Sequence, residues 1–117
     1  MTRGTLWVRG PVLLDQYAAV SVKLATIKQA MRADGMWQAQ PLEAEQYEFH
    51  QAFGADTMTF SQWLQFVLVP RVELVLSSRS TLPSNSSVGT KAIREFDSDP
   101  RAGGLVTLLC EFDQLFD

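Results

Sequence analysis

Residue types on which metal sites, disulfides and membrane anchors depend are scarce in this chain. Its 117 residues include one cysteine, Cys110, and one histidine, His50. No disulfide can form within the chain, and a zinc site built from cysteine and histidine is excluded, whereas a site made only of carboxylates stays open. The longest unbroken apolar run, residues 66–69, is far shorter than the ~20 residues of a transmembrane helix. We therefore expect no membrane span, and we expect the chain to act in the reducing cytoplasm.

Basic residues are fewer than acidic ones, 10 against 13. The net charge is −3, so the chain lacks the electrostatic footprint of a nucleic-acid-binding domain. Basic residues are concentrated in one set, which consists of Arg71, Arg79, Lys91, Arg94 and Arg101. No aromatic residues that could stack on bases are interleaved with this set, so we do not expect direct nucleic-acid binding. No glycine-rich phosphate loop and no Gly-x-Ser-x-Gly elbow occur, and we expect no cofactor.

Helical periodicity dominates what is present. Residues 11–34 carry an apolar stripe with spacings of 4 and 3, which lies on one face of a helix; its members are Leu13, Tyr17, Val20, Leu24, Ile27 and Met31. Pro11 suits the first turn, and Gly35 suits the left-handed residue that ends a helix. Lys23, Lys28 and Arg32 lie off the stripe, on the predicted solvent side.

Residues 36–58 predict an irregular connection with one short helical piece, because Pro41 and Gly54 interrupt the pattern. A connection of this length needs a reason to stay ordered. Its apolar side chains supply one if they are pinned into the core; they are Trp37, Leu42, Tyr47, Phe49 and Phe53.

A second long helix is predicted from Thr59 to about residue 77. Thr59 and Gln62 have the spacing of a capping box, and Met58 and Trp63 that of a hydrophobic staple. Pro70 lies inside this helix, so a kink is predicted over residues 66–70. Because this helix is apolar on nearly every side, we expect it to be the most enclosed one.

The remaining sequence predicts a serine-rich loop at 77–90 and two further helices. The first covers about residues 88–96 and turns Val88, Ala92, Ile93 and Phe96 inward. The last begins at Asp99 as its cap, with Pro100 in first position. Gly103 and Gly104 suggest close packing against a neighbour. The fold class is therefore all-α: residues 1–10 are an N-terminal extension, and residues 11–117 form one small bundle of about four helices, with the central helix kinked at Pro70.

Motifs of the central helix and the C-terminus resemble the YqcC-like family of small bacterial proteins. The similarity begins near Leu14, is most specific from Asp56 to Arg71, and is supported by the ending LLCEFDQLFD. The resemblance implies a small helical bundle without an established activity. Members are often encoded beside a tRNA pseudouridine synthase, which makes such an enzyme a candidate partner. A synthase activity of the chain itself is not expected, because the sequence predicts no β-sheet that could carry a catalytic aspartate.

Arg71 is the polar residue that most needs an explanation. It follows Trp63 and Val67 at intervals of four, and a buried arginine there would require a carboxylate such as Asp56 or Asp113. The alternative is that Arg71 belongs to a binding site. His50 has no recognisable orienting partner, and Cys110 is interpreted as a buried structural thiol.

Three functions remain open on these grounds. The sequence favours a non-enzymatic interaction or accessory protein. The alternatives are a small-ligand-binding bundle with an apolar pocket near Trp37, Phe53 and Trp63, and an enzyme that uses carboxylates with Arg71. The sequence does not specify an oligomeric state.

Overall fold

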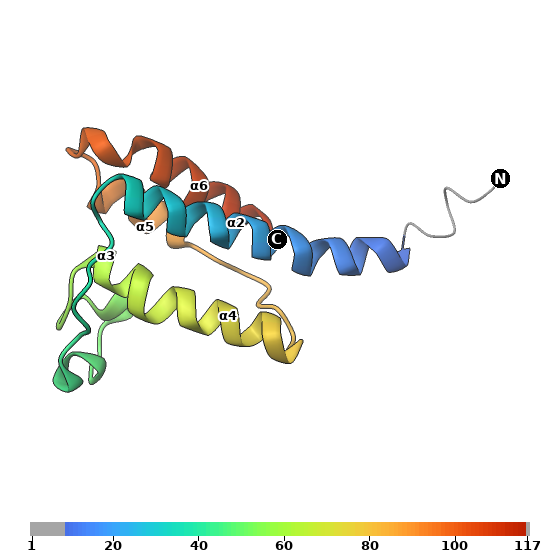
Figure 1. Cartoon of the computed structure of the whole chain (residues 1–117), viewed down its shortest axis with the longest axis horizontal. Coiled ribbons are helices and arrows are strands. Elements are labelled where there is room, and N and C mark those ends of the chain that lie inside the picture. The colour runs from blue at the N-terminus through green and yellow to red at the C-terminus, as the bar shows by residue number, and fades with distance from the viewer. Residues whose placement is uncertain (1–8, 117) are drawn as a thin grey trace.

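The computed structural model describes residues 9–116, which form an all-α structure without strands in that range (Figure 1). The predicted fold class is confirmed. Residues 1–8 of the predicted N-terminal extension lie outside the described range, and Arg9 and Gly10 already belong to the first helix. The helices are α2 (Arg9–Ala33), α3 (Phe60–Trp63), α4 (Val69–Ser78), α5 (Val88–Glu95) and α6 (Gly103–Gln114). No helix among these residues is both long and apolar enough to span a membrane.

Helix α2 follows its predicted stripe. Val20, Leu24, Ile27 and Met31 are all buried, while Leu13 lies among the residues whose side-chain surroundings are not described. Gly35 follows the end of the helix and has a φ of +75°. The N–H of Met36 donates to the carbonyl of Met31 at 2.8 Å, and that of Gly35 donates to Arg32 at 3.2 Å. These two bonds form the Schellman motif, which requires a left-handed residue where the sequence supplies glycine.

The second long helix begins as predicted at Thr59. The Gln62 N–H donates to Thr59 Oγ1 at 3.1 Å, and the Thr59 N–H donates to Gln62 Oε1 at 2.9 Å. Between α3 and α4 lies a π-helical segment, Leu64–Leu68, in which the Val69 N–H bonds to the carbonyl of Leu64 five residues earlier. Proline lacks an N–H and crowds the preceding turn. The irregularity predicted beside Pro70 is therefore present, as a widened turn rather than a break.

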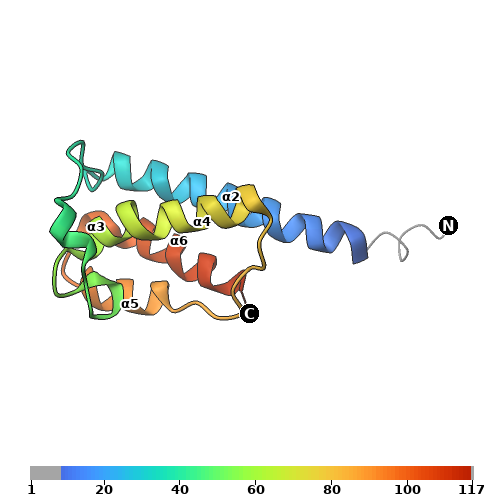
Figure 2. The ribbon, with the colours of Figure 1, turned by 90° about the horizontal axis from the view of Figure 1, so that it is seen from below.

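The core forms where three long elements meet. Helices α4 and α6 both pack on α2, and α5 packs on α6 (Figures 1 and 2). Ile27, Leu64, Leu105 and Leu109 are fully buried at this centre. The prediction that the central helix is the most enclosed one holds only for its first part. Helix α3 and the π-helical segment are mostly buried, whereas Val69 is the only buried residue of α4.

Helix α5 faces the core differently from the prediction. Val88 and Ala92 are buried as expected, but Ile93 is 52% exposed. Gly89 is buried instead, and a Cβ there would lie 2.6 Å from Cys110 Cα. The close packing predicted at Gly103 and Gly104 is wrong, because a Cβ on either would meet no atom within 4 Å. The bundle's close approach is therefore between α5 and α6, at Gly89.

The connection before the central helix contains two 3₁₀ turns, Ala44–Tyr47 and Ala52–Gly54, where one helical piece was predicted. Leu42 is buried in the core, and Trp37, Phe49 and Phe53 pack against it. The prediction fails for Tyr47, which is 50% exposed. The last helix is preceded by a third 3₁₀ turn, Pro100–Ala102, which Asp99 caps by accepting the Arg101 N–H.

Candidate functional site

Arg71 lies near the start of α4 with an exposed side chain. The prediction that it pairs with Asp56 or Asp113 is wrong, since neither carboxylate forms an ion pair with it. The cause is the π-helical segment, which inserts one residue into the turn. Trp63 and Val67 are buried on one ridge, and the inserted residue carries that ridge on to Val72 instead of Arg71.

Asp56 organises the loop that precedes the central helix. Its two carboxylate oxygens accept the backbone N–H groups of His50 and Gln51, at 3.0 and 3.3 Å. The hydrogen bond from His50 is the main reason that the pKa of Asp56 lies below its ordinary value of 3.8. Asp56 therefore acts within the loop. The side chain of His50 is exposed and forms no hydrogen bond or ion pair with another described residue.

Asp113, on α6, supplies the N-terminal cap of α5. One carboxylate oxygen accepts from Ser86 Oγ and from the Val88 N–H at 3.0 Å, and the other accepts from the Gly89 N–H at 2.7 Å. Ser87 holds the cap position but makes no side-chain bond there. Free N–H groups at a helix start favour a negative partner, so Asp113 fixes both the start of α5 and the end of the serine-rich segment.

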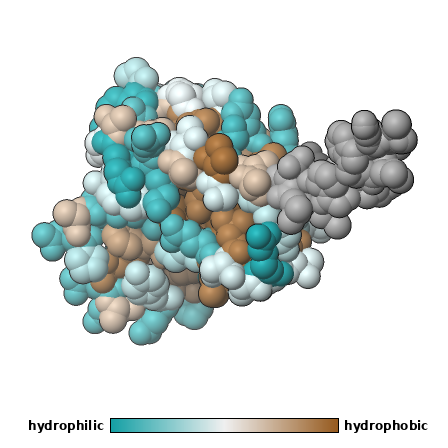
Figure 3. Space-filling view, turned by 45° about the vertical axis from the view of Figure 1, so that its right-hand side comes forward, coloured by the Kyte–Doolittle hydropathy of each residue, from teal (hydrophilic) through white to brown (hydrophobic). Residues whose placement is uncertain are grey.

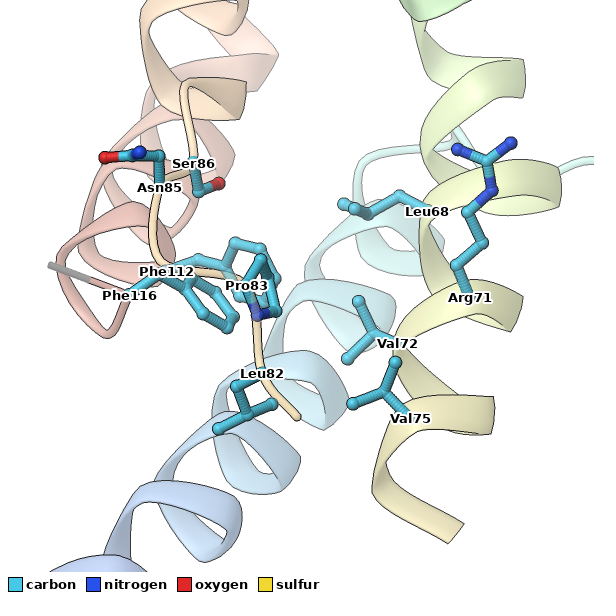
Figure 4. A pocket seen from close by; sticks show the side chains of 10 residues that line it. All are labelled: Leu68, Arg71, Val72, Val75, Leu82, Pro83, Asn85, Ser86, Phe112 and Phe116. Atoms are coloured by element: carbon cyan, nitrogen blue, oxygen red, sulfur yellow. The ribbon is translucent and has the colours of Figure 1, made fainter. Parts of the chain in front are cut away.

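An apolar groove of about 350 Å³ lies beside Arg71, between α4, the segment before α5, and α6 (Figure 4). Seven of its lining residues are apolar; they are Leu68, Val72, Val75, Leu82, Pro83, Phe112 and Phe116. Arg71, Asn85 and Ser86 are the polar ones. Figure 4 shows Val72 and Val75 of α4, and Leu68 of the π-helical segment before it, reaching toward Pro83 and Leu82 on the opposite wall.

The predicted pocket residues Trp37, Phe53 and Trp63 fill space rather than enclose it. The rings of Phe53 and Trp63 meet edge to face, with centroids 4.9 Å apart. Phe53 adopts a φ of +59°, a left-handed conformation that is rare for an aromatic residue and that the ring contacts hold in place. Trp37 is half-buried beneath the guanidinium of Arg32, 4.6 Å from the ring centroid. The apolar groove therefore lies elsewhere, at the site of Arg71.

Gln65 is the buried polar residue that the sequence interpretation missed. It is 7% exposed, and its amide clamps the backbone of Gln38: the Gln38 N–H donates to Oε1 at 2.9 Å, and Nε2 donates to the Gln38 carbonyl at 2.8 Å. A glutamine inside the apolar run WLQFVLV was the available signal, because buried polar groups are almost always hydrogen-bonded. The clamp holds the connection after α2 onto the central helix.

The other candidate groups do not assemble a reactive centre in the described structure. Glu43, Glu45 and Glu48 are exposed. Within residues 9–116 no three His, Cys, Asp or Glu side chains come together as a metal site would require. Cys110 is half-buried, with its Sγ against Gly89, so it packs at the α5–α6 contact. The apolar groove with Arg71 at its rim is therefore the candidate binding site of the described structure.

Comparison with known proteins places this architecture in a family. Residues 19–115 match the profile of the family described as tRNA pseudouridine synthase C. An uncharacterized protein of Haemophilus influenzae is 32% identical over 77 residues, which are 63% of this chain and 73% of that protein. A Pectobacterium carotovorum protein named tRNA pseudouridine synthase C is 38% identical over 64 residues, which are 55% of this chain but only 17% of that much longer protein.

A solved structure agrees with the fold. The solution NMR structure of protein YqcC from E. coli matches with a TM-score of 0.77 and 25% sequence identity, covering 86% of this chain and 87% of that one. The resemblance noted in the sequence is thus confirmed over most of the chain's length. The chain belongs to the YqcC-like family, whose profile carries the description tRNA pseudouridine synthase C.

Proposed function

We propose that this protein is a non-enzymatic accessory protein that binds a tRNA pseudouridine synthase in the bacterial cytoplasm. One observation carries the proposal: a stretch similar to this chain makes up 17% of a longer Pectobacterium protein named tRNA pseudouridine synthase C. Joining two units in one polypeptide greatly raises their effective concentration for each other. Such a fusion is useful where the two units act together. Two separate chains need a binding interface to be held close to each other in the same way.

The roles of the candidate side chains support an accessory role over an enzymatic one. Asp56 and Asp113 are engaged with backbone N–H groups, which orders loops. Among the described residues no carboxylate forms an ion pair with Arg71 that could make it a catalytic partner. A general acid or base must reach the group whose proton it transfers, and it is commonly oriented by a third residue. Among the described residues, the groove has neither a general acid or base at its lining nor a residue that would orient one.

The groove itself favours a second candidate, the binding of a small apolar ligand. Its volume of about 350 Å³ is at the lower end of the ~300–1,000 Å³ of ligand pockets. A thermal-shift series with straight-chain carboxylic acids tests this candidate. A rise in melting temperature that grows with chain length, and that Arg71→Glu abolishes, supports it; an unchanged melting temperature throughout the series rejects it.

The accessory role is tested with purified components. The chain and the tRNA pseudouridine synthase of the same bacterium are mixed and analysed by size-exclusion chromatography with light scattering, followed by calorimetric titration. We expect a stable complex of defined stoichiometry, with a pseudouridine synthase of another family as the negative control. The absence of heat and of a shifted peak at about 100 μM, where even weak interfaces are populated, would reject the proposal.

A further inference from the structure

We propose that the groove between α4 and residues 82–86 receives an apolar helical segment of the partner, whose neighbouring carboxylate pairs with Arg71. This inference rests on the proposed function and names the surface that would carry it. The shape of the groove, its openness to solvent and the charge at its rim support this assignment.

The wall formed by α4 and the end of the π-helical segment has the spacing of a helix-binding surface. Leu68, Val72 and Val75 follow one another at intervals of four and three, so they form one stripe along the helix. Seven residues of helix extend about 10 Å, which matches two turns of a bound helix presenting apolar residues at similar intervals. Phe112 of α6 and Phe116, just after that helix, form the buried floor.

The groove is partly open to solvent. All three stripe residues and Leu82 are only half-buried, and Pro83 and Asn85 are exposed. Small-molecule sites enclose some 70–90% of the ligand surface, more than a groove with one open side provides. A protein segment needs to bury only one face, so openness favours a protein segment as the occupant. Figure 3 shows apolar residues at the surface on the face of the molecule that it draws.

The fold leaves this side of α4 uncovered. Helix α4 packs on α2, and the residues that follow it, 80–87, cross toward α5 without forming a helix (Figure 1). Leu74, which is 65% exposed, lies three residues after Arg71 and hence on the same side of α4. It extends the apolar surface beyond the rim, where a bound segment would contact it.

Arg71 sets the charge of the rim. The nearby charged groups already have partners: Glu73 pairs with Lys28 at 2.9 Å, and Asp113 holds the start of α5. The exposed guanidinium of Arg71 forms no ion pair within residues 9–116. In a chain of net charge −3, one unpaired arginine beside an apolar groove is complementary to an apolar segment that carries an acidic residue.

The two parts of the site should act on different steps of binding. A charge pair at the rim mainly accelerates association and makes it dependent on salt, whereas apolar contacts at the centre slow dissociation. The Arg71→Glu variant should therefore lower the association rate several-fold and flatten its salt dependence. The Val75→Asp variant places a charge inside the groove and should weaken affinity at least about tenfold, chiefly through faster dissociation.

The experiment measures binding kinetics between immobilised synthase and four variants of the whole chain. Arg94→Glu is the charge-matched control at an exposed position of α5, and Val22→Asp is the control on the outer face of α2, where Val22 is 66% exposed. Both controls should bind within about twofold of the unaltered chain, as surface changes outside an interface do. Melting curves of all four variants establish that each is folded.

The possible results separate the two proposals. If the unaltered chain does not bind the synthase, both the proposed function and the groove assignment are overturned. If it binds and the groove variants match their controls, the partner stands and the groove assignment is wrong. Loss of binding in Val22→Asp, with Val75→Asp unaffected, would place the interface on α2.

Discussion

Replacing Gly89 by alanine should separate α5 from α6. Gly89 is buried in α5, and a Cβ at this position would lie 2.6 Å from Cys110 Cα, 2.8 Å from its backbone N and 2.8 Å from its Sγ. Two of these atoms are backbone, so a change of rotamer at Cys110 cannot make room. The two helices would have to move apart.

The expected size of the effect follows from these distances. Carbon atoms in contact prefer ~3.5–4.0 Å, so the displacement is about 1 Å, and overpacking of this kind costs about 1–3 kcal/mol. The same shift stretches the bond from the Gly89 N–H to Asp113, now 2.7 Å, and a hydrogen bond to a charged group contributes about 1.5–3 kcal/mol. The higher helix propensity of alanine offsets about 1 kcal/mol. We expect the free energy of unfolding to fall by about 2–4 kcal/mol, the net of these terms.

Urea unfolding followed by circular dichroism measures this change. Gly104→Ala makes the same chemical change in α6, where no atom lies within 4 Å of the new Cβ. That control should be neutral or stabilised by up to about 1 kcal/mol. If Gly89→Ala proves as stable as Gly104→Ala, the described approach of α5 to α6 is incorrect.

Further predictions concern the polar contacts. Gln65→Leu should lower the free energy of unfolding by about 1–3 kcal/mol, because the N–H and carbonyl of Gln38 lose their partners; an unchanged urea midpoint would mean that water replaces the clamp. Asp113→Ala should cost about 2–4 kcal/mol, since the cap of α5 is lost, and hydrogen exchange should accelerate at residues 88–92; protection equal to that of the unaltered chain would contradict this cap. The pKa of Asp56 is lowered in the fold, mainly by the His50 N–H, so its stabilising contribution is present above its ordinary pKa of 3.8 and is lost as the pH falls through the lower folded value. Asp56→Ala should therefore show a shallower loss of stability below about pH 4 than the unaltered chain; identical acid profiles would show that the carboxylate contributes nothing there.

Features that depend on a few neighbouring residues could be predicted from the sequence. The capping box at Thr59, the left-handed glycine after α2 and the apolar stripe of that helix each involve residues within one or two turns. Their hydrogen bonds and burial appear in the structure as predicted. Such signals were sufficient for the fold class, because an apolar stripe on each helix leaves few alternatives to a bundle.

Contacts between distant residues could not be predicted in the same way. Gln65 and Gln38 are 27 positions apart, and Asp113 and Gly89 are 24 apart. Either member of such a pair looks like an ordinary surface residue or an ordinary glycine until the helices are placed side by side. The close approach was therefore assigned to Gly103 and Gly104, whereas the structure has it at Gly89.

The site of Arg71 was located in part. The sequence singled out Arg71 correctly as a residue to be explained, but assumed an uninterrupted α-helical register from Trp63. The π-helical segment Leu64–Leu68 shifts that register and brings Arg71 to the surface. In place of the predicted buried ion pair, Arg71 lies beside a groove that combines residues from α4, the segment after it, and α6.

The central claim is that this chain binds a tRNA pseudouridine synthase through the groove beside Arg71. The most direct test is a methyl NMR titration of the whole chain with the synthase. We expect the signals of Leu68, Val72, Val75 and Leu82 to shift or broaden, while those of Val22 stay unchanged. A spectrum without changes at saturating synthase, or changes centred on Val22, would contradict it.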